Sequence, residues 1–239
     1  FAPWLLNLEA LAKNAGYEDS AMPSMVAACR EAAGGQLMSI PYQANVVGFF
    51  YNADIFEKVG VSAPKTWAEL LTVCEQIKAA GYTPITADDT TVSTLIGHHL
   101  GRLVGEAGVR DIVTNAKWDD PAVVQFANDY AELAAKGYFS PNIATNVYPN
   151  GQNGELASGQ AAMYLTGSWM PNAAKGFAGE AFRWGCFPYP AVNNGIVGTE
   201  AVSYGAQVMA INVKSQVSEE AFQLIRYLTS GKADKTLST

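Results

Sequence analysis

The sequence has few of the residues that most often bind metals. It contains three cysteines and two histidines among 239 residues. Cys29, Cys74 and Cys186 have no CxxC neighbour and no zinc-ligand spacing, and three cysteines cannot all pair with one another. His98 and His99 are adjacent, so on a helix they point about 100° apart and cannot share a metal as residues four apart would. We therefore expect neither a zinc site nor another cofactor.

Basic residues are also scarce. Acidic residues number 22 against 15 basic ones, which gives a formal charge of −7. Such a chain offers no cationic field to nucleic acid or to an anionic membrane surface, whereas a neutral or cationic small ligand fits. The longest apolar runs, such as VVGFFY (46–51), stop far short of a membrane-spanning helix, so we expect a soluble chain.

Targeting signals and several enzyme motifs are missing. The chain starts without methionine, a signal sequence or a lipid-attachment cysteine, so either targeting has been removed or the sequence begins within a longer protein. Neither GxxxxGK[ST] nor GxGxxG occurs, which argues against a nucleotide enzyme. The stretch AVSYGA (201–206) lacks the first glycine of a GxSxG elbow, so no serine nucleophile stands out.

The composition and the apolar patterns of the sequence predict an α/β fold. With 49% hydrophobic and 15% charged residues the chain is globular. Apolar periodicity and end signals, among them a capping box of Thr66 and Glu69, predict helices at 65–81, 92–104, 120–137 and 218–231. Continuous apolar runs predict strands covered on both faces, at 37–42, 46–51, 83–86, 161–166, 184–189 and 208–212. Their alternation predicts mostly parallel sheets, and the Asn- and Gly-rich stretches 146–155 and 191–200 predict loops.

Trp169 follows directly on a predicted strand end. The stretch AAMYLTGSWM (161–170) runs through an apolar strand into Gly167 and then places a tryptophan where the chain turns. Such turns are where α/β proteins keep ligands. The alternative is that Trp169 only fills a hole in the core.

Asp88 and Asp89 follow another predicted strand end and have three interpretations. A pair of carboxylates can hydrolyse glycosides, but that chemistry needs them roughly 5–9 Å apart across the bond, and sequence neighbours usually diverge. They can lie in a solvated turn in which one aspartate caps the next helix. One of them can also accept hydrogen bonds from ligand hydroxyls. Asn45, Tyr204 and Gly205 lie beside other strands, as a site built from strand ends requires.

Three segments, in this order, carry a family resemblance. They are IPYQANVVGFFYNADIFEKVGVSAPKTWAELL (40–71), NGELASGQAAMYLTGSWM (153–170), and SYGAQVMAINVKSQVSEEAFQLIRYLTS (203–230). The first resembles a YN.D.FEK.G...P.TW.EL stretch after an interlobe crossover, the second an F..G.AAM...G.W signature, and the third a return strand followed by a helix. Together they resemble the extracellular solute-binding proteins of ABC transporters, in the sugar-binding, maltose-binding-protein-like branch (family 1).

This resemblance implies a two-lobed, periplasmic-binding-protein type II-like α/β fold with crossing hinge strands. The crossings then fall near 43–46 and 187–190, lobe one combines 1–44 with 190–239, and lobe two is 45–189. Family members have a further βα segment before lobe one and closing helices at the end, so the resemblance implies a chain truncated at both ends.

The resemblance also implies a function. Members of this branch bind a sugar between the lobes and deliver it to the transmembrane permease subunits of an ABC importer, in the periplasm or, as lipoproteins, at the outer face of the cytoplasmic membrane. A monomer without cofactor or nucleic-acid partner is implied. Trp169 matches the family's sugar-stacking tryptophan, and Asn45 a position where maltose-binding protein has a carboxylate. The other implied ligand-binding residues are Asp88, Asp89, Thr90, Tyr204 and Gly205.

Two alternatives come from other classes. A carbohydrate-cleaving enzyme would use Asp88 or Asp89. A binding protein for a non-sugar solute, such as a polyamine or a metal chelate, is compatible with the charge of −7. The tryptophan platform favours a neutral polyol instead.

Overall fold

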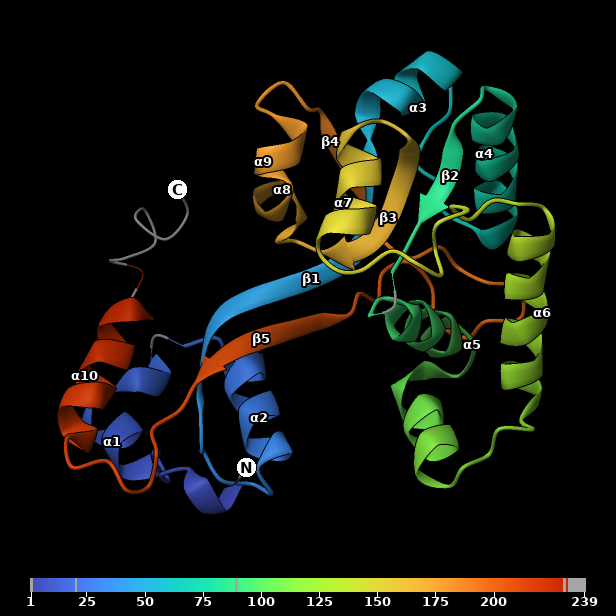
Figure 1. Ribbon diagram of the computed structural model, residues 1–239. Coiled ribbons are helices and arrows are strands. Elements are labelled where there is room, and N and C mark those ends of the chain that lie inside the picture. Colours follow the sequence, from blue (N-terminus) through green and yellow to red (C-terminus); the bar gives the residue numbers. More distant parts are fainter. Residues whose placement is uncertain (1, 20, 89, 230, 232–239) are drawn as a thin grey trace. The chain divides into compact units, whose positions relative to one another are not determined.

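The computed structural model describes residues 2–19, 21–88, 90–229 and 231. Its contacts divide the chain into two compact units, each of which is described by itself: unit 1 is 1–45 with 204–239, and unit 2 is 46–203. The elements of unit 1 are η1 (Ala2–Trp4), α1 (Glu9–Asn14), η2 (Tyr17–Asp19), α2 (Pro23–Ala32), β5 (Tyr204–Met209) and α10 (Ser218–Leu228). Strand β1 (Ile40–Asn52) begins in unit 1 and ends in unit 2 (Figure 1).

The elements of unit 2 alternate between helices and strands. They are α3 (Ala53–Val59), α4 (Trp67–Ala79), β2 (Thr83–Thr86), α5 (Val92–Thr114), α6 (Pro121–Ala135), α7 (Asn150–Ala157), β3 (Ala161–Gly167), α8 (Met170–Ala173), α9 (Lys175–Ala178) and β4 (Trp184–Phe187). The predicted α/β fold class is therefore confirmed.

Unit 1 joins two segments that are far apart in the sequence. Leu8 on the N-terminal side and Ile211 and Phe222 on the C-terminal side share one buried cluster. The backbone amide of Leu6 donates to the carbonyl of Ile211 at 2.8 Å, which ties the two segments together. Burial of these apolar side chains is the main favourable contribution to such a small core.

The sheet of unit 2 is mixed, so the prediction of mostly parallel sheets is wrong. Its order is β2-β3-β1-β4, and β5 also pairs with β1. Strand β1 is antiparallel to β3 and β4, with Phe49 opposite Leu165 and Phe187, whereas β2 and β3 run parallel. Alternation of helices and strands predicts parallel pairs when consecutive strands become neighbours. Here β1 pairs with strands from the far end of the unit, so that rule does not apply.

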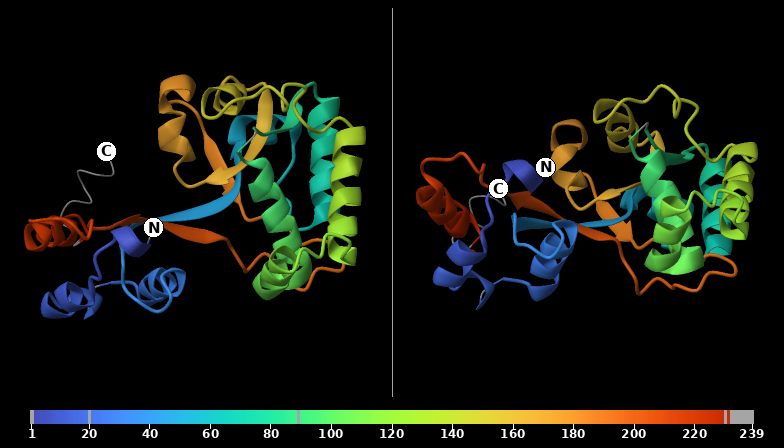
Figure 2. Two further views of the ribbon diagram at one scale, coloured as in Figure 1. Left: turned by 60° about the horizontal axis from the view of Figure 1, so that its bottom comes forward. Right: turned by 90° about the horizontal axis from the view of Figure 1, so that it is seen from below.

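Both faces of this sheet are covered, as the continuous apolar runs predicted. All of β3 is buried, and its successive residues point to opposite faces. Met163 and Leu165 belong to the cluster that includes residues of α4, α5 and α6, while Tyr164 packs with residues of α7 and α8. The green helices α4, α5 and α6 stay together on one side of the strands in the views of Figure 2. The carboxyl end of β3 is thereby fixed between two layers.

Local end signals set the helix boundaries. Glu69 donates its backbone amide to Thr66 Oγ1 at 3.2 Å and accepts the Thr66 amide at 3.3 Å, which confirms the predicted capping box of α4. The predicted start of the 120–137 helix is likewise confirmed, because Asp120 accepts the Ala122 amide at 2.9 Å before α6. Helix α5 continues beyond the predicted end, through a kink at Gly105 whose φ of 69° suits glycine.

Three other sequence expectations need correction. The runs 37–42 and 46–51 are joined, from Ile40 onward, in one strand, β1, and the last predicted strand lies at Tyr204–Met209 instead of 208–212. The pattern of 146–155 predicts a loop, but α7 begins within it. Burial of Leu156 against β3 and α8 stabilises this helix, and its Asn- and Gly-rich sequence gives no sign of that packing.

The second unit boundary falls later than residue 190, where the sequence placed it. The segment 190–203 lies in unit 2 because Arg102 of α5 holds both of its ends. The buried Arg102 donates from Nε and Nη2 to the Tyr189 carbonyl at 3.1 and 2.7 Å, and from Nη1 to the Ala201 carbonyl at 2.7 Å. Over the described residues, every helix is too short or too polar to cross a bilayer.

Candidate functional site

Trp169 lies where the sequence placed it, directly beyond the end of β3. Its side chain keeps 36% of its surface exposed, so it does not simply fill the core. Its backbone opens α8, where the Trp169 carbonyl accepts the Ala173 amide at 2.9 Å. The preceding Ser168 is tied to β1, because its amide donates to the Val46 carbonyl at 2.9 Å and its Oγ accepts the Val46 amide at 3.3 Å. The tryptophan is thus presented to solvent from a fixed backbone.

Asp88 follows β2 and is fully buried, so the solvated-turn interpretation is wrong for it. Its Oδ1 accepts the Thr90 and Thr91 amides at 2.7 and 3.1 Å, which fixes the turn before α5. Its Oδ2 accepts the Tyr164 hydroxyl at 2.6 Å and the Thr91 hydroxyl at 3.1 Å. Burial raises the pKa of Asp88, but the hydrogen bonds from Thr90, Tyr164 and Thr91 outweigh burial and lower it overall. The carboxylate therefore stays ionised at neutral pH, with no proton to donate.

The neighbouring threonine is more accessible. Thr90 is exposed, and its hydroxyl donates to Asp88 Oδ1 at 2.5 Å. Because that proton is engaged, the hydroxyl oxygen is left as an acceptor for an outside donor. Asp89 lies outside the described residues.

The other predicted site residues belong to unit 1. Asn45 is half-buried near the middle of β1, and Tyr204 opens β5 with 51% of its surface exposed. No atom lies within 4 Å of the space that a side chain at Gly205 would occupy, so the chain itself leaves that backbone open. Trp169, Asp88 and Thr90 lie in unit 2.

A buried carboxylate that sequence reasoning missed organises the same edge of unit 2. Glu155 of α7 accepts the hydroxyls of Thr86 and Ser140 at 2.5 and 2.8 Å. It also accepts the amide groups of Asn142 and Asn146 at 2.8 and 3.1 Å. Burial raises the pKa of Glu155, but the four hydrogen bonds more than offset this and lower it. Its donors come from positions 9 to 69 residues away, so no local pattern marks it.

Both histidines lie on α5, as the sequence predicted, and the environment of His99 is a buried hydrogen-bond network. His99 is fully buried, with Nε2 2.9 Å from Asp129 Oδ2 and Nδ1 3.0 Å from the Tyr189 hydroxyl. The Tyr189 hydroxyl in turn lies 2.9 Å from that of Tyr130. Burial lowers the pKa of His99, and the opposing effect of Asp129 is smaller. The ring is therefore neutral in the folded chain at neutral pH.

The two histidines give a prediction of how the stability of the protein depends on pH. Because the pKa values of His98 and His99 are lowered on folding, the unfolded chain takes up protons first as the pH falls. We expect the melting temperature to decrease between about pH 7.5 and about pH 5.5, through the ordinary histidine pKa of about 6.5. Replacing both histidines with glutamine should flatten this decrease, measured by circular dichroism at several pH values. An equally steep decrease in the double variant would contradict the assignment.

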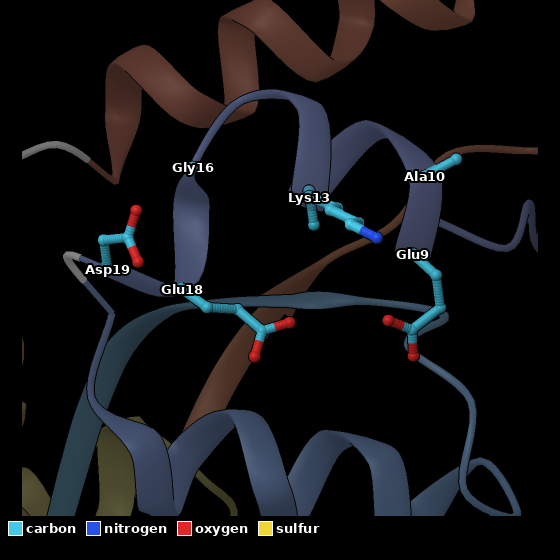
Figure 3. Close-up of a pocket in the computed structure, with 7 residues that line it drawn as sticks. Glu9, Ala10, Lys13, Gly16, Glu18 and Asp19 are labelled. Atoms are coloured by element: carbon cyan, nitrogen blue, oxygen red, sulfur yellow. The ribbon is translucent and has the colours of Figure 1, made fainter.

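A cavity of about 470 Å³ lies in unit 1, away from the predicted residues of that unit. Figure 3 shows the carboxylates of Glu9, Glu18 and Asp19 and the ammonium of Lys13 around it. Two of these carboxylates share one guanidinium, since Arg30 Nη2 lies 2.8 Å from Glu9 and 2.5 Å from Glu18. Part of the wall of the cavity is therefore ion-paired.

The part of the chain that the structure describes also contains possible metal ligands and thiols. No group of three or more His, Cys, Asp or Glu residues in that part is placed to hold a metal ion. The cysteines there are unpaired, with Cys29 and Cys74 buried and Cys186 exposed. Accessible aromatic and polar groups lie at the strand ends of unit 2, at Trp169 and Thr90.

The model of the bacterial extracellular solute-binding protein family matches residues 2–235, and the chain belongs to that family. This family consists of substrate-binding proteins and not of enzymes.

The known proteins that resemble this chain include sugar-binding proteins. The multiple sugar-binding protein of Streptococcus mutans is 28% identical over 83% of this chain and 48% of its own length. A chitin oligosaccharide binding protein superposes with a TM-score of 0.80 at 25% identity, over 98% of this chain and 59% of that one. A sugar transporter from Bacillus licheniformis in complex with stachyose shares the fold, with a TM-score of 0.75 at 19% identity over 98% of this chain and 61% of that one. The chain spans about half the length of the first curated relatives it matches.

Proposed function

We propose that this chain belongs to an extracytoplasmic binding protein that captures a sugar or oligosaccharide and delivers it to the permease subunits of an ABC importer. The observation that carries the proposal is the indole of Trp169, which is fixed at the end of β3 with 36% of its surface exposed. Membership in the solute-binding family and the sugar-binding relatives support the same assignment. The protein then works as a monomer in the periplasm or, with a lipid anchor, at the outer face of the cytoplasmic membrane.

The chemistry of a sugar explains why such a residue is needed. A pyranose ring has an apolar face of C–H groups and a rim of hydroxyls, so its site requires an aromatic plane and directional hydrogen-bonding groups. Trp169 supplies the plane. The exposed hydroxyls of Thr90 and Tyr204, the amide of Asn45 and the open backbone at Gly205 supply the rim in this proposal. Asp88 acts through Thr90, because its carboxylate accepts the hydrogen bond from the Thr90 hydroxyl.

The ionised carboxylate of Asp88 fits a protein that binds a sugar without cleaving it. A glycosidase acid must carry a proton, but the hydrogen bonds around Asp88 lower its pKa and occupy both of its oxygens. We propose that the protein is a carrier and not a catalyst.

Transport also needs a conformational change that ligand binding favours. We propose that the two units close on the sugar by rotation near the boundaries after Asn45 and Ser203. The unit-2 ends of both crossings are held together, because the Val47 amide donates to the Ser203 carbonyl at 3.0 Å. Ser168, next to Trp169, bonds to Val46 at the same place. A sugar on Trp169 thus contacts a residue adjacent to the proposed hinge.

A ligand screen on the complete natural protein tests the proposal. Stachyose, raffinose and chitin oligosaccharides are compared with spermidine and a metal chelate, because a ligand that binds the native state raises its melting temperature. We expect a saturable rise with at least one saccharide and no released product from fluorescently labelled oligosaccharides. A rise with spermidine alone, or steady release of shorter sugars, would replace the proposal with a polyamine carrier or a glycosidase.

A further inference from the structure

The last residue of β3 lies directly under the indole. A β-carbon added to Gly167 would come within 1.9 Å of Trp169 Cζ3, 2.2 Å of Cη2 and 2.3 Å of Cε3. All three distances are far below van der Waals contact, so the six-membered ring of the indole rests against the bare backbone of Gly167. The glycine is not required by its own backbone, because Gly167 is absent from the positive-φ positions of the chain. A side chain at position 167 would therefore meet the indole in its present orientation.

The surrounding backbone cannot easily move to make room for a side chain. Gly167 is the partner of Val47 in the antiparallel β1–β3 ladder, and Ser168 is hydrogen-bonded to Val46 through both its amide and its hydroxyl. On the other side, α8 begins at Met170, which is only 1% exposed. A methyl group at position 167 is therefore relieved by turning the indole and not by shifting the strand.

We propose that Gly167 is the positioning residue of the binding platform: its missing side chain sets the direction of the Trp169 ring before a ligand arrives. The inference rests on the proposed role of Trp169 in stacking a sugar. Stacking needs the ring plane at one angle, and a ring that is already held there loses less conformational freedom on binding. Gly167 acts through Trp169 and touches no ligand itself.

The test is a double-mutant cycle of Gly167→Ala and Trp169→Ala in the complete protein, with stachyose, raffinose and a chitin oligosaccharide as probes. For each probe that the wild type binds, we expect Gly167→Ala to weaken binding at least about fivefold. The same change in the Trp169→Ala background should have no further effect. Gly176→Ala is the matched control, because no atom lies within 4 Å of its added β-carbon and its φ is ordinary; it should leave affinity unchanged.

A spectroscopic measurement separates positioning from general damage. The protein is labelled with 5-fluorotryptophan, and the Trp169 resonance is assigned through a Trp169→Phe variant. Gly167→Ala should shift that resonance and leave those of the other tryptophans in place. An unmoved resonance, or an equal loss of affinity with and without the indole, would overturn the inference. If the wild type binds no saccharide, the proposed function fails, whereas the fluorine spectrum still decides whether Gly167 sets the ring.

Discussion

Replacing Trp169 with alanine should weaken carbohydrate binding by at least about tenfold, which corresponds to about 1.4 kcal/mol. The change removes an aromatic face that is exposed to solvent and fixed by α8, while leaving the buried core around Met170 in place. A tryptophan face buries a large apolar area when it meets the C–H face of a sugar, so its loss exceeds that of a single hydrogen bond. Isothermal titration calorimetry on the complete protein measures the effect.

The chain offers a matched control for this substitution. Trp118 is 57% exposed and lies in the connection between α5 and α6. Trp118→Ala removes the same side chain from the surface of the same unit, and we expect it to leave affinity unchanged. Trp169→Phe should retain part of the binding because it keeps an aromatic face. Equal affinities for the wild type and Trp169→Ala would remove the stacking role.

Replacing Glu155 with glutamine should destabilise the protein by on the order of 3 kcal/mol. The carboxylate accepts four hydrogen bonds, and the amide of the variant would aim an N–H group at donors that themselves need acceptors. A buried donor without an acceptor cannot recover its lost hydration. Urea denaturation at neutral pH, followed by circular dichroism, measures the loss. Glu132→Gln is the control, since Glu132 forms an exposed ion pair with Lys136 and its removal should change stability little.

Acidification provides a second readout for the same residue. The folded pKa of Glu155 is lowered from its ordinary 4.5, so its stabilisation is present above that value and is lost as the pH falls through the folded pKa. The wild type should lose stability more steeply than Glu155→Gln in this acidic range. Parallel curves for the two proteins would show that Glu155 does not contribute in this way.

The site was predictable only where it depends on local order. The apolar run 161–166 followed by Gly167 placed Trp169 beyond a strand end from the sequence alone, and the apolar run 83–86 placed Asp88 after a strand in the same way. The structure has these strands as β3 and β2. The burial of Asp88 was not predictable, because Tyr164, 76 positions along the chain, donates to its carboxylate. Glu155 and His99 were missed as members of networks for the same reason: their partners are brought to them by the sheet and by the packing of α5 against α6.

The sequence by itself determined the α/β class, the ends of α4 and α6, the positions of most strands and the family resemblance. These features depend on hydrogen bonds and apolar spacing within a few residues, such as the reciprocal bonds of Thr66 and Glu69. Only the tertiary structure decided the direction of β1 against β3 and β4, the attachment of 190–203 to α5 through Arg102, and the contact of the indole with Gly167. The strand directions and the attachment of 190–203 to α5 depend on contacts between residues far apart in the chain. The contact between the indole and Gly167 is local, but it depends on the conformation that β1 and α8 impose on 167–170. Packing of the whole unit therefore sets them.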